Sequence, residues 1–178
     1  MMDEVEIRKE KMRQMLAKKT DASYEELIKK LEEIGFFEAP ASTKYHGSYE
    51  GGLFEHSYLV AETLNKMTEQ MGLEWRRKES PVLVGLLHDV CKCDAYKKIE
   101  DGYVYNKETL YAGHGDKSVM IAVSIANLDD EMIACIRYHM GSFTEKEEWN
   151  YYSRAVRRYK NVLWTHAADM YVSNVLEV

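Results

Sequence analysis

Apolar residues recur at gaps of three and four along most of this chain, and the segments that carry the spacing end at glycines. Such spacing places apolar side chains on one face of an α-helix, so it predicts amphipathic helices rather than strands. Only two prolines, Pro40 and Pro81, occur among the 178 residues. Because proline breaks helix interiors, their scarcity favours a mostly helical protein. At about 150 residues per domain, the length predicts one domain, or one domain with an appendage.

Capping residues and glycines mark the ends of the expected helices. Ser23 with Glu26 and Thr144 with Glu147 form capping-box patterns, and Ser80 stands as an N-cap before a proline. The expected helices cover residues 3–19, 24–34, 53–71, 82–87, 116–127, 129–140, and a last segment from about residue 144 toward the C-terminus with one break. Residues 36–52 lack periodicity, and a loop of this length inside a compact domain is often functional.

One segment departs from the helical spacing. Residues 96–100 and 103–105 are rich in tyrosine and flank Asp101-Gly102, a sequence typical of a two-residue hairpin turn. We therefore expect an all-α helical bundle that carries a small β-hairpin. Residues 1–40 are expected to form an N-terminal helical extension packed on the domain, and residues 41–178 the domain itself.

Charge and apolar content limit the function. Acidic residues outnumber basic ones by 30 to 24, and the net charge of −6 gives no general attraction to nucleic acid or anionic membranes. The longest apolar stretches are too short to span a bilayer, and no signal peptide is visible. Three cysteines cannot all pair within one chain, which favours a reducing compartment. We expect a cytoplasmic protein with no membrane partner and no long nucleic-acid partner.

Several imidazoles and carboxylates fall on the apolar faces of the expected helices. His56 and His139 share faces with apolar residues, His88-Asp89 end the most apolar helix, and Asp169 lies on a half-apolar stripe. Each residue alone is most often a satisfied core residue or half of an ion pair. Together, neutral imidazoles and two carboxylates converge in a core only if a cation compensates them. Imidazole and carboxylate suit Mn²⁺, Fe²⁺, Co²⁺, Ni²⁺ or Zn²⁺.

The order of these residues resembles the HD-domain metal-dependent phosphohydrolase superfamily. Residues 86–92, Leu-Leu-His-Asp-Val-Cys-Lys, are similar to the signature of that family, and His114 and His139 match the extra histidines of members that can hold a second metal. Tyr45-His46-Gly47, followed by Gly-Gly-Leu-Phe-Glu-His-Ser at residues 51–57, resembles the HD module of bacterial 3′–5′ exoribonucleases. Those enzymes join an OB-fold to the HD domain, whereas residues 1–40 are too few and too helical for an OB-fold.

The resemblance implies a metal centre. It implies a first ion held by His56, His88, Asp89 and Asp169. His114 and His139 would bind a second ion or the substrate phosphate. The implied cofactor is therefore one or two divalent transition-metal ions, either Mn, Fe, Co, Ni or Zn. A thiolate site at Cys91-x-Cys93 is disfavoured, because the chain has no second cysteine pair of this kind.

The resemblance also implies which residues act on the substrate. Asp89 can bridge two ions and Lys92 lies near the phosphate, which makes them the implied catalytic residues. The alternative for Lys92 is a structural pair with Asp89 or with the helix end. His46 and Lys117 would face the substrate together with Lys92. His166 is expected to orient a carboxylate or to pack.

The function implied by the resemblance is cleavage of a phosphoester of a nucleotide or short oligonucleotide through a metal-activated water. Phosphomonoesters and phosphodiesters both fit. Two alternatives stay open: an HD-type di-iron oxygenase, and a non-catalytic module that binds a metal or a nucleotide. Substrate identity, metal identity and oligomeric state are not encoded in these motifs.

Overall fold

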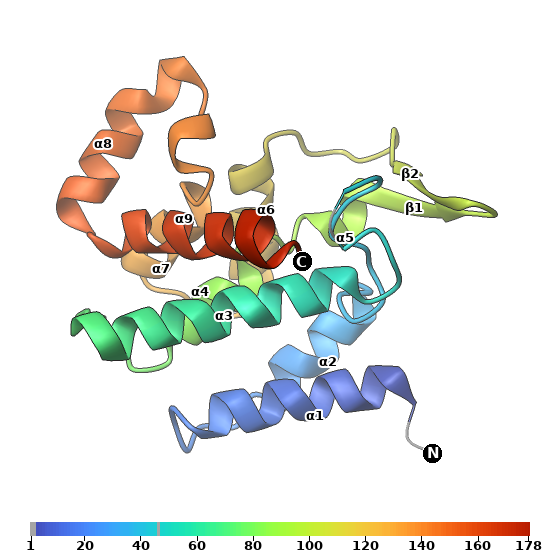
Figure 1. Cartoon of the computed structure of the whole chain (residues 1–178), viewed down its shortest axis with the longest axis horizontal. Coiled ribbons are helices and arrows are strands. Elements are labelled where there is room, and N and C mark those ends of the chain that lie inside the picture. The colour runs from blue at the N-terminus through green and yellow to red at the C-terminus, as the bar shows by residue number, and fades with distance from the viewer. Residues whose placement is uncertain (1–2, 46) are drawn as a thin grey trace.

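The computed structural model describes residues 3–45 and 47–178 of the chain. Its helices are α1 (Glu4–Ala17), α2 (Glu25–Glu33), α3 (Gly52–Met71), α4 (Ser80–Leu87), α5 (Lys92–Ala95), α6 (His114–Ile125), α7 (Asp130–Arg137), α8 (Trp149–Arg158) and α9 (Asn161–Tyr171). Short 3₁₀ turns η1 (Gly141–Phe143) and η2 (Lys146–Glu148) precede α8, and a π-helical segment η3 (Val172–Leu176) extends α9. Strands β1 (Tyr96–Ile99) and β2 (Gly102–Tyr105) form one antiparallel hairpin. The all-α fold with a small hairpin is confirmed (Figure 1).

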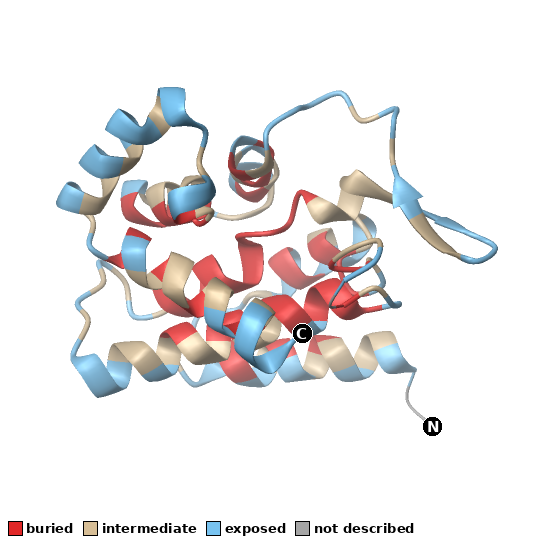
Figure 2. Ribbon diagram, turned by 45° about the horizontal axis from the view of Figure 1, so that its top comes forward, coloured by how far each residue is buried: buried red, intermediate tan, exposed pale blue. Residues whose placement is uncertain are grey.

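The centre of the bundle is α4. All eight of its residues are buried, and α3 runs across it along the middle of the molecule (Figure 1). Gly85 permits this crossing, because a Cβ there would lie 2.3 Å from the Cα of Ala61 on α3. Buried residues gather where these helices meet, whereas α8 and the hairpin are largely exposed (Figure 2).

The N-terminal helices share the core of the rest of the chain. Leu16 of α1 and Leu31 of α2 belong to the same buried cluster as the helices of the bundle. The ring centroids of Phe36 and Phe37 lie 5.4 Å apart in an edge-to-face arrangement, and those of Phe37 and Phe54 of α3 lie 5.6 Å apart. The division at residue 40 into an extension and a domain stays a prediction.

A loop from residue 34 to residue 51 leads from α2 into α3, as the missing periodicity predicts. Arg8 of α1 stabilises it by donating hydrogen bonds to the carbonyls of Phe37 at 3.0 Å and Glu50 at 3.2 Å. Gly51 caps α3 with a φ of +85°, and a Cβ there would lie 2.3 Å from the guanidinium carbon of Arg8. Only glycine combines this backbone conformation with that close approach.

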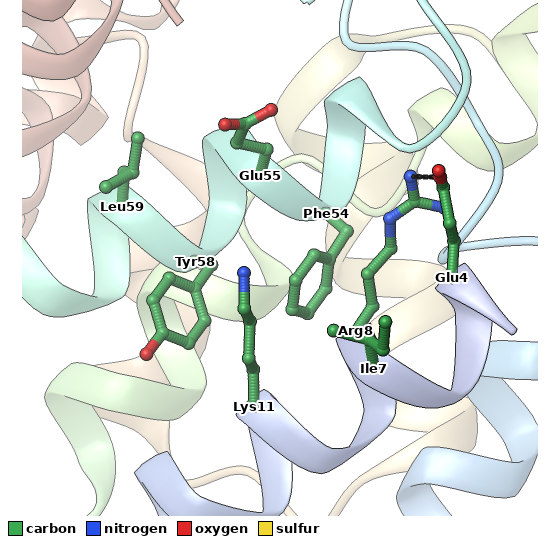
Figure 3. Close-up of a pocket in the computed structure, with 8 residues that line it drawn as sticks. All are labelled: Glu4, Ile7, Arg8, Lys11, Phe54, Glu55, Tyr58 and Leu59. Carbon is green, nitrogen blue, oxygen red and sulfur yellow. Dashed lines mark hydrogen bonds and ion pairs between the residues drawn. The ribbon is translucent and has the colours of Figure 1, made fainter. Parts of the chain in front are cut away.

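A separate pocket of about 430 Å³ lies between α1 and α3. Figure 3 shows Ile7, Arg8 and Lys11 of α1 beside Phe54 and Tyr58 of α3. None of the candidate site residues in the described part of the chain lines this pocket.

Three capping predictions are wrong. The N-cap of α2 is Tyr24 rather than Ser23. Ser80 lies inside α4, whose N-cap is Glu79, because the amide of Ser80 already bonds to the carbonyl of Arg77 at 3.1 Å. The last helix begins at Trp149 rather than near Thr144. The indole of Trp149 donates to the carbonyl of Thr144 at 2.7 Å, which holds the intervening residues in a separate turn.

The hairpin turn is shifted by one residue from its predicted place. Ile99 pairs with Gly102, so the turn residues are Glu100 and Asp101 rather than Asp101-Gly102. This register places the rings of Tyr96 and Tyr105 directly across the ladder at 5.4 Å, and such cross-strand aromatic pairs stabilise a register.

Helices near the site also differ slightly from expectation. α6 begins at His114, two residues early, and α7 ends at Arg137, three residues early. Asp129 caps α7 as its position suggests, accepting hydrogen bonds from the amides of Glu131 and Met132 at 3.0 Å each. In the described ranges no helix is both long enough and apolar enough to cross a membrane.

Candidate metal centre

Five helices position imidazole and carboxylate side chains close together in the bundle. His56 lies in the second turn of α3, and Asp169 lies in α9. His88 and Asp89 follow α4 directly, because that helix ends where its apolar run ends. His114 is the first residue of α6, and His139 follows the end of α7. These six residues are the metal ligands implied by the sequence, and the fold brings all of them together.

The first group consists of His56, His88 and Asp169. The Nε2 atoms of His56 and His88 are 3.3 Å apart. Asp169 Oδ1 lies 3.2 Å from Nε2 of His56 and 3.8 Å from Nε2 of His88. His56 and His88 are almost fully buried, whereas the Asp169 side chain is 14% exposed.

The second group consists of Asp89, His114 and His139. Asp89 Oδ1 lies 2.7 Å from Nε2 of His114 and 3.4 Å from Nε2 of His139. Its other oxygen, Oδ2, lies 3.5 Å from Nε2 of His88 and 3.6 Å from Nε2 of His56. One carboxylate therefore faces both groups, with a different oxygen toward each.

Backbone carbonyls fix the tautomers of three imidazoles. The Nδ1 atoms of His56, His88 and His139 each lie 2.7–2.8 Å from a carbonyl oxygen. The acceptors are the carbonyls of Val178, Gly85 and Ile136. Because a carbonyl only accepts, each Nδ1 carries the proton and each Nε2 carries a lone pair.

The Nε2 atoms of these rings face the same buried space. The facing Nε2 atoms of His56 and His88 repel one another unless a cation lies between them, and the buried Nε2 of His139 has no hydrogen-bond partner. Imidazole nitrogens and carboxylate oxygens at this spacing are the donor set of divalent transition metals. The residues therefore fit a metal, and each of the two groups could hold one ion.

Charges in the site are set by burial and by mutual contact. Burial lowers the pKa of His88 to about 4, so this imidazole is neutral near neutral pH. Burial alone would raise the pKa of Asp89, but Lys92 and His114 outweigh it and hold that pKa well below its usual range. The pKa of Asp169 is also lowered, because its contacts with the rings of His56 and His88 outweigh its burial.

His114 is the exception among the imidazoles. Burial lowers its pKa, but the Asp89 carboxylate outweighs this and raises the pKa to about 10. A proton therefore occupies this ring without metal, and metal binding at the nitrogen would release it. The Nδ1 of His114 lies 3.2 Å from Sγ of Cys91, so Cys91 contacts a candidate ligand and lies outside both groups.

Lys92 provides a second positive charge beside Asp89. Its Nζ lies 2.6 Å from Asp89 Oδ2, and its side chain is 13% exposed. Burial lowers the pKa of Lys92, but the Asp89 carboxylate outweighs it and the net pKa is raised. The ammonium therefore stays charged beside the carboxylate.

A pocket of about 400 Å³ opens over this centre. Its lining includes four residues predicted from the sequence: Asp89, Lys92, His114 and Asp169. The other lining residues are Met140, Phe143, His166, Met170 and Ser173. His166, expected from the sequence to orient a carboxylate or to pack, also lines the pocket. Its position on the same helix face as Asp169 is the sequence signal for this. Phe143 gave no periodic signal, because it lies in a 3₁₀ turn.

One predicted substrate residue, Lys117, lies away from this pocket. Lys117 is buried, forms an ion pair with Asp94 at 2.5 Å and donates a hydrogen bond to Thr109. It is not among the described residues that line the pocket over Asp89. His46 lies outside the residues that the structure describes.

Comparison with known proteins identifies the family of the chain. The family model of the HD domain matches residues 53–172, about two thirds of the chain. The chain therefore belongs to the HD-domain family, within the metal-dependent phosphohydrolase superfamily.

Among curated proteins, the chain is similar to the dihydroneopterin 2′,3′-cyclic phosphate phosphodiesterase of Methanocaldococcus jannaschii. The two are 40% identical over 73 residues, which are 39% of this chain and 29% of that protein. The match thus spans less than a third of the length of the relative. No solved structure shows a significant match.

Proposed function

We propose that the protein is a metal-dependent phosphohydrolase that cleaves a phosphoester of a nucleotide or a nucleotide-like small molecule. The observation that carries this proposal is the environment of Asp89. One buried carboxylate faces two groups of candidate metal ligands, and it is paired with a lysine that lines an open pocket. Divalent metal ions held there would supply Lewis-acid activation of water and of the phosphate oxygens.

Lys92 would bind and neutralise the substrate phosphate. Its ammonium lies within the pocket, next to the carboxylate that faces both ligand groups. A fixed positive charge at this point stabilises the additional negative charge that phosphorus oxygens acquire in the transition state.

His166 would accept a proton in the pocket and return it to the leaving oxygen. It lines the pocket, and its Nδ1 lies 2.8 Å from the carbonyl of His139, so that nitrogen donates to the backbone. The Nε2 atom is then the one available to exchange a proton with the substrate.

The relative suggests one substrate to include in a test. That protein is named for a 2′,3′-cyclic phosphate, which is a phosphodiester. The pocket over Asp89, at about 400 Å³, has the size of small-molecule sites. We therefore infer that 2′,3′-cyclic nucleotides, nucleoside monophosphates and short oligonucleotides form the informative panel. Free thiols at all three cysteines support a reducing, cytoplasmic location.

The test of this function is phosphate or alcohol release from that panel by protein loaded with Mn²⁺, Co²⁺, Ni²⁺ or Zn²⁺. The same protein loaded with Fe²⁺ is placed in an oxygen electrode. Oxygen consumption with an iron chromophore and no phosphoester turnover would instead identify an oxygenase. Metal binding with neither activity would identify a binding module.

The substitution Lys92→Gln tests whether Lys92 contributes to catalysis or only pairs with Asp89. We expect the metal content to stay normal and kcat/KM to fall about a hundredfold, because one transition-state contact to charge is lost. Elemental analysis measures the metal content, circular dichroism checks the fold, and steady-state kinetics measure kcat/KM. Lys117→Gln is the matched control, since this buried lysine pairs with Asp94 rather than with Asp89. Parent turnover in Lys92→Gln with normal metal content would show that Lys92 only pairs with Asp89.

A further inference from the structure

We propose that the substrate is a single nucleotide-like unit whose planar heterocycle stacks on Phe143, and that oligonucleotides are excluded. This inference rests on the proposed phosphohydrolase function and narrows its substrate class. Three features of the described residues carry it: a second pocket beside the metal centre, an exposed ring between the two pockets, and the charge of the second pocket.

The second pocket adjoins the first. It has a volume of about 490 Å³ and shares His114, Met140 and Phe143 with the pocket over Asp89. A ligand that places its phosphate beside Asp89 and Lys92 can therefore extend past Phe143 into the second pocket.

Phe143 is suited to stacking. Its side chain is 64% exposed although it lies beside a deeply buried site. It ends the 3₁₀ turn η1, and its amide donates to the carbonyl of Met140 at 3.0 Å. Its ring packs edge to face against His166, with centroids 6.4 Å apart. A flat aromatic face held in this way can stack on any heterocyclic base.

The second pocket is negatively charged. Its carboxylates come from four side chains, Asp116, Glu145, Glu147 and Glu148. Two cations line it as well: His114, which lies next to Asp89, and Arg137, which already pairs with Asp116 and with Glu148 at 2.7 Å, so carboxylates stay in excess. A neutral ring can enter such a pocket, whereas a second phosphate would meet like charge. The pocket thus favours a substrate with one phosphate group.

The first experiment removes the ring. Metal-loaded parent protein and Phe143→Ala are assayed with guanosine 2′,3′-cyclic phosphate and with glycerol cyclic phosphate, which has no base. We expect kcat/KM for the nucleotide to fall about tenfold or more and that for the glycerol ester to stay within about twofold. Tyr151→Ala, a change at a 59% exposed ring that lines neither pocket, should alter neither value. Equal losses on both esters, or no loss on either, would overturn the proposal.

The second experiment removes charge. The parent protein should cleave the cyclic mononucleotide faster than a dinucleotide, and Glu145→Gln with Glu147→Gln should raise the relative rate on the dinucleotide. Glu26→Gln with Glu33→Gln on α2 makes the same change in net charge away from both pockets. A parent preference for the dinucleotide would contradict the proposal.

Binding measurements keep this proposal separate from the proposed function. If the loaded protein hydrolyses no phosphoester, the proposed phosphohydrolase function fails. Calorimetry then compares guanosine 3′-monophosphate with glycerol phosphate on the parent and Phe143→Ala. A loss of affinity confined to the nucleotide supports stacking on Phe143, and equal affinities in the two proteins reject it.

Discussion

Asp89 faces both groups of candidate ligands because its two carboxylate oxygens have different neighbours. Oδ1 faces His114 and His139, while Oδ2 faces His88, His56 and the ammonium of Lys92. Such a carboxylate is costly to bury at the end of an apolar helix unless cations surround it. Asp89 is only 3% exposed. The same neighbours therefore stabilise its buried charge and would influence metal binding by this carboxylate.

Cys91 positions one candidate ligand. The rings of His56, His88 and His139 are held by backbone carbonyls, which no side-chain substitution removes, whereas His114 is held by a thiol. Cys91→Ala should weaken metal binding at the second group about tenfold and leave the first group unchanged, since loss of such an orienting partner costs 10–100-fold in affinity.

Titration calorimetry of metal-free protein with Mn²⁺ or Zn²⁺ measures both steps. Cys91→Ser should restore the second step, because a hydroxyl can replace the thiol as partner. Cys93→Ala is the neighbouring control, as Cys93 makes no contact with the ring of His114 in the described contacts. Two equally weakened steps would mean that Cys91 supports the whole site through packing.

At the residue scale, the sequence predicts those site residues that follow helical spacing or belong to a short motif. His56 and Asp169 follow helical spacing, and His88-Asp89 with Lys92 follow a short motif. Phe143 follows neither, because a 3₁₀ turn has no apolar period. The pairing of Lys117 with Asp94 depends on how α6 packs near the hairpin, and spacing along the chain contains no such information.

At the scale of elements, the crossing of α3 and α4 positions the first ligand group. His56 lies on one of these helices and His88 ends the other, and their Nε2 atoms meet at 3.3 Å only if the helices pack closely. The close approach occurs at Gly85, whose carbonyl also accepts the hydrogen bond from Nδ1 of His88. Packing and ligand orientation thus depend on the same residue.

Gly85→Ala should destabilise the protein by about 1–3 kcal/mol, the usual cost of overpacking a core. In an ordinary helix interior the same change stabilises by about 0.5–1 kcal/mol, so the expected sign is reversed by the contact with Ala61. Chemical denaturation measures the change. Gly72→Ala is a comparison for backbone strain without a clash, because a Cβ there meets no atom within 4 Å but the φ of +63° disfavours alanine. A stabilised Gly85→Ala protein would show that α3 and α4 can separate freely.

Helix locations follow from apolar spacing, but several boundaries do not. A capping pattern competes with tertiary contacts, and at Thr144 the indole of Trp149 takes the carbonyl and fixes a different turn. In the hairpin, the Tyr96–Tyr105 pair accompanies a register one residue away from the one that Asp101-Gly102 predicts. Local preference therefore located these elements, and side-chain contacts set their ends.

At the scale of the whole molecule, the site is a product of the complete fold. The candidate ligands come from positions between residues 56 and 169, and the elements that carry them share one hydrophobic core with α1 and α2. Without a cation, folding brings imidazole lone pairs and two carboxylates together in a buried space. A ligand that binds the folded state alone stabilises it by mass action, so metal removal should weaken the entire domain.

Metal removal should lower the melting temperature by about 5–10 °C. Binding at a hundred times the dissociation constant adds about 2.7 kcal/mol, and each kcal/mol corresponds to about 2–4 °C for a protein of this size. Differential scanning calorimetry of metal-loaded and chelator-treated protein measures the difference. Asp89→Ala is the control, because loss of the carboxylate that faces both ligand groups should abolish most of the metal-dependent shift, whatever its own melting temperature. An unchanged melting temperature after complete metal removal, or a full shift in Asp89→Ala, would show that these residues do not form the metal site.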